Sequence, residues 1–140
     1  MILITCIDEN NGMMFNKRRQ SRDKILTKHI CELANDAKIW VNNFSKEIFD
    51  EQNNNNVIVD DEFINKISKD EYCFIENISP STLENKIDKI ILYYWNRVYP
   101  ADMYFDIKLE DWELESETEF AGSSHERITQ KVFIRGKNNE

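Results

Sequence analysis

Glycine and proline are scarce in this chain: of 140 residues, three are glycine and two are proline. The glycines, Gly12, Gly122 and Gly136, lie far apart, so the sequence has no glycine-rich loop of the kind that brings backbone amides against a phosphate group. That is little glycine for an enzyme that binds a nucleotide.

Patterns typical of metal sites, disulfide frameworks and membrane spans are missing as well. The only histidines are His29 and His125, and no CxxC or HxH spacing occurs, so we expect no metal ligands. The cysteines, at positions 6, 31 and 73, are odd in number and lie in apolar segments, which predicts buried thiols in a reducing compartment. Without a 20-residue apolar run or a signal peptide, the chain is expected to be cytoplasmic and away from membranes.

Negative charge dominates the composition. The formal net charge is -8, which repels nucleic acid, while a hydrophobic content of 41% suffices for one compact domain over residues 1–140. Basic residues cluster once, in NKRRQSR from Asn16 to Arg22. An anionic ligand or an RNA would therefore have to bind at this local patch.

Strand-like and helix-like segments alternate through most of the chain. Ser21 is expected to cap a helix over 22–34, and further short helices are predicted over 44–49, over 60–67 and from Pro80. Strands are predicted over 2–7, 38–41, 57–59, 71–75, 89–97, 112–118 and 127–135. This order predicts an α/β fold with a mostly parallel central sheet and an antiparallel C-terminal hairpin.

Several segments follow one another in a specific order: the opening strand running into Asp8, Asn10 and Gly12-Met13, then IWVNNFSKEIF, YCFIENISPSTLENKI, DKIILYYWNR with ADMYFD, and EDWELES. This order resembles dihydrofolate reductase across nearly the whole chain. The resemblance implies the three-layer α/β/α fold of that family. It also implies that Asp23 contacts a pterin and assists protonation, and that Ser45, opening the second helix, binds a cofactor phosphate.

The chain departs from that family where the family holds its substrates. Lys17-Arg18-Arg19 replaces an apolar Leu-Pro-Trp in the first loop, and Tyr93 replaces a pterin-contacting threonine. Glu76-Asn77 replaces the double glycine that lies against the cofactor pyrophosphate, so a carboxylate stands where phosphate oxygens belong. The cofactor is thus unknown, and NADPH is disfavoured.

A second resemblance, carried by FNKRRQSRD, YWNRVYPAD and GSSHERIT, is to short bacterial proteins labelled ribonuclease Z. That label implies a two-zinc hydrolase, which needs an HxHxDH-type cluster. Two isolated histidines cannot supply one, so we reject that mechanism for this chain.

Three groups of polar residues are candidates for a site. In the first, Asn16, Arg18, Arg19 and Gln20 could clamp an anion, or the arginines could instead pair with the chain's own acidic surface. The second is Asn96, Arg97 and Asp102 after the long strand, where a structural Arg97–Asp102 bridge is the alternative. The third is Ser124, His125 and Glu126, in which an exposed His125 could act as acid or base, or the segment could be a plain hairpin turn.

The favoured hypothesis is a divergent dihydrofolate reductase-like domain that binds an anionic small molecule, such as a nucleotide, pterin or phosphate ester, through the cationic first loop. Asp23 or His125 would carry protons, and NADPH-dependent reduction would be lost. One alternative is a non-catalytic binding or regulatory domain for a protein or RNA partner. Another is a retained NADPH-dependent reductase.

Overall fold

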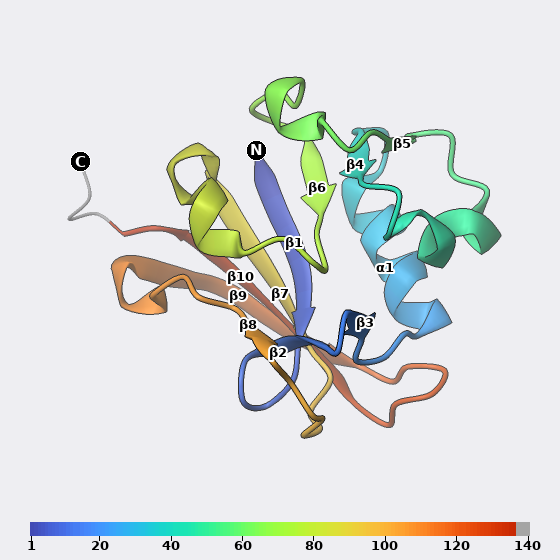
Figure 1. Cartoon of the computed structure of the whole chain (residues 1–140), viewed down its shortest axis with the longest axis vertical. Coiled ribbons are helices and arrows are strands. Elements are labelled where there is room, and N and C mark those ends of the chain that lie inside the picture. The colour runs from blue at the N-terminus through green and yellow to red at the C-terminus, as the bar shows by residue number, and fades with distance from the viewer. Residues whose placement is uncertain (137–140) are drawn as a thin grey trace.

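A seven-stranded sheet forms the centre of the computed structural model, which describes residues 1–136 (Figure 1). Its strand order is β5-β4-β6-β1-β7-β10-β9. The strands are β1 (Ile2–Ile7), β4 (Ile39–Val41), β5 (Val57–Val59), β6 (Tyr72–Phe74), β7 (Lys89–Tyr94), β9 (Trp112–Phe120) and β10 (Ile128–Arg135). The first five of these pair in parallel, whereas β10 runs antiparallel to β7 and β9 antiparallel to β10. The predicted fold class is confirmed.

Two apolar layers cover the sheet because neighbouring residues of a strand face opposite sides. Ile4 of β1 faces the helix α1 (Lys24–Ala34) and the 3₁₀ helix η1 (Lys46–Gln52). Leu3 faces the other layer, which contains the 3₁₀ helices η2 (Phe63–Asn65) and η3 (Pro80–Lys86). A further 3₁₀ turn, η4 (Leu109–Asp111), leads into β9. No helix in residues 1–136 is long and apolar enough to cross a membrane.

Three sequence predictions about helices need correction. The predicted helices at 44–49, 60–67 and from Pro80 are short 3₁₀ segments, and the first long helix begins at Lys24 rather than Arg22. Asp23, not Ser21, caps that helix, because its Oδ1 accepts hydrogen bonds from the amides of Ile25 and Leu26. Ser21 is thereby left outside the helix.

The predicted cationic loop is a β-hairpin within a second, three-stranded sheet that the sequence prediction missed. This sheet has the order β3-β2-β8 and consists of β2 (Gly12–Phe15), β3 (Arg18–Arg19) and β8 (Met103–Tyr104). Asn16 and Lys17 form its turn, with φ angles of 51° and 62°, as a type I′ turn requires. The hairpin lies at the end of the main sheet where β1 ends (Figure 1).

The left-handed conformation of Lys17 generates a prediction about stability. Lys17→Gly and Lys17→Val both remove the charge, but only valine adds a branched Cβ that opposes a positive φ. We expect the glycine variant to exceed the valine variant in unfolding free energy by about 1 kcal/mol or more in urea titrations. Equal stabilities would show that the turn relaxes freely.

Candidate functional site

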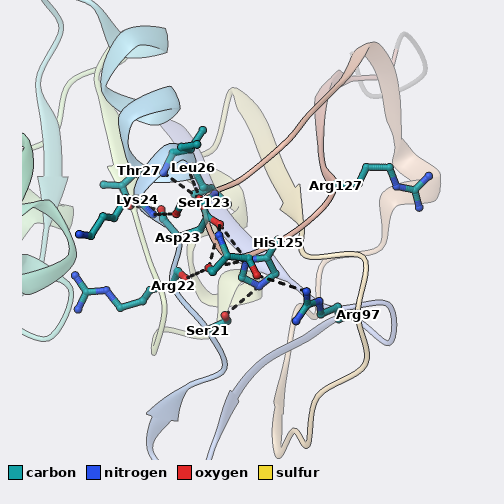
Figure 2. Close-up of polar contacts among 12 residues, drawn as sticks. Ser21, Arg22, Asp23, Lys24, Leu26, Thr27, Arg97, Ser123, His125 and Arg127 are labelled. Atoms are coloured by element: carbon teal, nitrogen blue, oxygen red, sulfur yellow. Dashed lines mark hydrogen bonds and ion pairs between the residues drawn. The ribbon is translucent and has the colours of Figure 1, made fainter.

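Asp23 and His125 meet at the start of α1, although about a hundred residues separate them in the sequence (Figure 2). His125 Nδ1 lies 3.1 Å from Asp23 Oδ2. The other ring nitrogen, Nε2, lies 3.1 Å from the hydroxyl of Ser21 and 3.1 Å from that of Tyr99. Trp95 stacks on the imidazole at 4.6 Å between ring centroids. His125 is therefore fixed on all sides.

The prediction of an exposed His125 was wrong, because this residue is only 4% exposed. The partner that orients it is Asp23, whereas Glu126 is exposed and Asp102 instead accepts a hydrogen bond from the amide of Asn16. No local pattern indicates this contact, because it joins the connection between β9 and β10 to the start of α1.

Asp23 is the most heavily hydrogen-bonded carboxylate of this region. In addition to capping α1, it accepts from the amide of Ser123 at 3.0 Å and from the amide and hydroxyl of Ser124 at 2.8 and 3.1 Å. Burial opposes ionisation, but these amide donors and His125 outweigh it and hold the pKa of Asp23 well below its usual range. Asp23 is accordingly an anion that can only accept hydrogen bonds.

Arg19 and Ser45 converge on Glu76, after β6. Glu76 accepts from Arg19 Nε at 2.8 Å and Nη2 at 3.1 Å, and from the Ser45 hydroxyl at 2.7 Å. Arg19 also contacts Glu47 and the carbonyl of Phe44. The Arg19 guanidinium and the Ser45 hydroxyl are thus already hydrogen-bonded to a carboxylate of the protein itself, and Ser45 is fully buried.

A pocket of about 250 Å³ lies beside the β2–β3 hairpin. Its lining residues are Phe15, Asn16, Arg18, Arg19, Gln20, Tyr99 and Pro100. The Gln20 amide group donates to Asp8 Oδ2 at 3.1 Å and to the carbonyl of Pro100 at 3.3 Å, while its Oε1 is buried without a donor among residues 1–136. Asp8, fully buried, and Tyr99 belong to this site although neither was predicted as a binding residue.

The structure does not bring the second predicted group, Asn96, Arg97 and Asp102, together at one site. Asn96, with a φ of 59°, donates to the Arg127 carbonyl and the Thr129 hydroxyl, which fixes the start of β10. Arg97 donates to the Ser124 carbonyl at 3.4 Å, so the suggested Arg97–Asp102 bridge is not formed. Asn96, Arg97 and Glu126 line a separate pocket of about 340 Å³.

Within residues 1–136, no group of three or more histidine, cysteine, aspartate or glutamate side chains is placed to hold a metal ion. Half-buried His29, the other histidine, hydrogen-bonds the Tyr93 hydroxyl at 2.8 Å and stacks on Phe120.

No family profile and no curated sequence matches the chain. Among solved structures it is similar to dihydrofolate reductase from Enterococcus faecalis complexed with NADP(H) and RAB-propyl. The TM-score is 0.67 at 13% sequence identity, over 99% of this chain and 96% of that one. The chain has a dihydrofolate reductase-like fold. At this identity the likeness concerns the fold alone.

The Asp23 network generates a prediction with a pH dependence. Asp23→Asn keeps the shape but removes the charge, and we expect it to lower the unfolding free energy at pH 7 by at least about 2 kcal/mol. A carboxyl whose pKa is lowered in the folded state stabilises above its unfolded pKa of about 4, and this contribution is lost as the pH falls further. The difference between variant and wild type should therefore shrink below pH 4 in urea titrations.

The matched control is Asp36→Asn, on an exposed aspartate, which should change stability by less than about 0.5 kcal/mol. A penalty for Asp23→Asn that stays constant down to pH 2 would contradict an ionised Asp23.

Proposed function

We propose that this chain binds an anionic small molecule, of the nucleotide, pterin or phosphate ester class, in the pocket beside the β2–β3 hairpin. The observation that carries the proposal is the pairing there of an uncompensated cation, Arg18, with an unsatisfied acceptor, Gln20 Oε1.

Arg18 supports the cation half of this argument. Its neighbour Arg19 is saturated by Glu76 and Glu47, whereas Arg18 makes no ion pair with any of residues 1–136. In a chain of net charge -8, a guanidinium left without a carboxylate partner is available for an external anion. Asn16, on the same pocket wall, adds an amide.

Gln20 supports the acceptor half. Both hydrogens of its amide group are directed at acceptors, which fixes the orientation of the carboxamide and leaves Oε1 buried. An unsatisfied buried acceptor costs about 1–3 kcal/mol, and a ligand N–H or O–H group would recover this. Phe15, Tyr99 and Pro100 add apolar walls, so the ligand we propose combines a ring, a hydrogen-bond donor and an anionic group.

His125 and Asp23 would act as the proton carrier for this ligand. Tyr99 connects the two regions, since its hydroxyl hydrogen-bonds His125 Nε2 and Tyr99 also lines the pocket. A proton held by the buried imidazole can thus reach the pocket through one hydroxyl.

NADPH, the cofactor implied by the fold, does not fit this proposal. The Glu76 carboxylate already accepts hydrogen bonds from the Ser45 hydroxyl and the Arg19 guanidinium, the groups that would bind a phosphate of the cofactor. Like charge would repel the cofactor there.

The first test uses thermal unfolding with GMP, folate and glucose 6-phosphate as probes. At least one should raise the Tm by mass action, and Arg18→Ala should weaken its Kd roughly 10- to 100-fold in calorimetric titration. Lys28→Ala removes one positive charge from the exposed face of α1 and should leave the Kd unchanged. Failure of every probe to shift the Tm, or an unchanged Kd in Arg18→Ala, would overturn the proposal.

The second test concerns the cofactor. Titration with NADPH should leave both the tryptophan fluorescence and the Tm unchanged. Saturable quenching together with NADPH oxidation in the presence of dihydrofolate would instead establish a retained reductase.

A further inference from the structure

Ser21, His125 and Asp23 form a continuous hydrogen-bonded chain (Figure 2). The Ser21 hydroxyl lies 3.1 Å from His125 Nε2, and Nδ1 of the same ring lies 3.1 Å from Asp23 Oδ2. A nucleophile, a base and a group that orients the base are recognised by this geometry and not by their order in the sequence.

The hydrogen-bond partners suit these roles. Asp23 is ionised and accepts hydrogen bonds only, so the His125 ring directs a proton on Nδ1 at Oδ2. Nε2 then presents its lone pair to the hydroxyls of Ser21 and Tyr99. The imidazole can accept the Ser21 proton without changing its position.

The surroundings of these three residues hold the base rigidly and leave the nucleophile accessible. His125 is buried against Trp95, whereas Ser21 is only half-buried. Ser21 follows Gln20 directly in the sequence, and the hydroxyls of Ser21 and Tyr99 both contact Nε2 of His125. Gln20 and Tyr99 both line the pocket described above.

The residue after Ser21 also has a backbone amide without an acceptor in the described part of the chain. The amide of Arg22, the residue after Ser21, makes no hydrogen bond to any acceptor among residues 1–136. In hydrolases with a serine nucleophile, the amide of the following residue commonly forms part of the oxyanion hole.

We infer that Ser21, His125 and Asp23 form a catalytic triad that hydrolyses small carboxylic esters. The Ser21 Oγ–carbon bond forms as the hydroxyl proton passes to His125 Nε2. The ester C–O bond then breaks, and the leaving alcohol takes that proton. Water next gives a proton to Nε2 as its oxygen bonds to the acyl carbon. Ser21 Oγ leaves and regains the proton, which releases the carboxylic acid.

Tyr99 competes with Ser21 for the Nε2 lone pair, since a neutral imidazole accepts one proton there at a time. Replacing Tyr99 with phenylalanine removes the competing donor and keeps the ring. The triad thus requires that Tyr99→Phe increase the reactivity of Ser21, a result that a purely structural role for these residues would not produce.

The experiment is labelling of the full chain with an uncharged fluorophosphonate, with the modified residue located by mass spectrometry. We expect a single adduct on Ser21, absent in Ser21→Ala and slowed at least about 100-fold in His125→Gln, because a positioned base contributes about 10²–10⁴-fold. Ser116→Ala, the same substitution on exposed β9, should label like the wild type. Hydrolysis of p-nitrophenyl acetate should follow the same order across these variants.

Should His125→Gln fail to unfold cooperatively, Ser21→Cys provides a second readout. A thiol in contact with His125 should react with iodoacetamide at pH 6 at least about tenfold faster than glutathione. No fluorophosphonate adduct on Ser21, or an ordinary rate for the cysteine variant, would overturn the inference. The fluorophosphonate carries no anionic group, so a failure to label Ser21 would not count against the proposed anion site. Conversely, a failure to bind anions would not affect the labelling of Ser21.

Discussion

The buried carboxylate of Asp23 is the interaction on which the rest of the site depends. It caps α1, holds the amides of Ser123 and Ser124, and orients His125. A desolvated charge is tolerated only when nearly all of its acceptor positions are occupied, so these partners are fixed relative to one another. One charge therefore ties the β9–β10 connection to the start of the long helix, and it holds the imidazole whose Nε2 lies near the hydroxyls of Ser21 and Tyr99.

The β2–β3 hairpin separates cations that are adjacent in the sequence. Side chains alternate across a strand, so Arg19 turns inward to Glu76 while Arg18 lies at the outer pocket. The Glu76 carboxylate of this inward pair also accepts a hydrogen bond from Ser45, the hydroxyl that the sequence resemblance had suggested for a cofactor phosphate. Of these two adjacent arginines, Arg18 is the one whose charge no carboxylate among residues 1–136 compensates.

Local patterns predicted the architecture well and the site poorly. Apolar runs such as Ile2–Ile7 and Lys89–Tyr94 reveal parallel strands because their burial is encoded within a few residues. The hairpin was missed because Asn16-Lys17 lacks the glycine that normally marks a type I′ turn. Asp23 rather than Ser21 caps the helix through local hydrogen bonds from the amides of Ile25 and Leu26. His125, in contrast, is buried through contacts across about a hundred residues that no local signal records.

The scarcity of glycine also has a structural meaning. A Cβ on Gly12 would lie 2.6 Å from Gln20 Nε2 and 3.0 Å from Asp8 Oδ2, and one on Gly122 would lie 2.8 Å from Ile128 Cδ1 and closer still to Asp23. Two of the three glycines thus make room for buried carboxylates rather than for a ligand's phosphate. Because backbone is brought close to the protein's own anions, the ligand we propose would be recognised by side chains such as Arg18 and Gln20. This differs from the double glycine against a cofactor pyrophosphate that the sequence resemblance to dihydrofolate reductase implies.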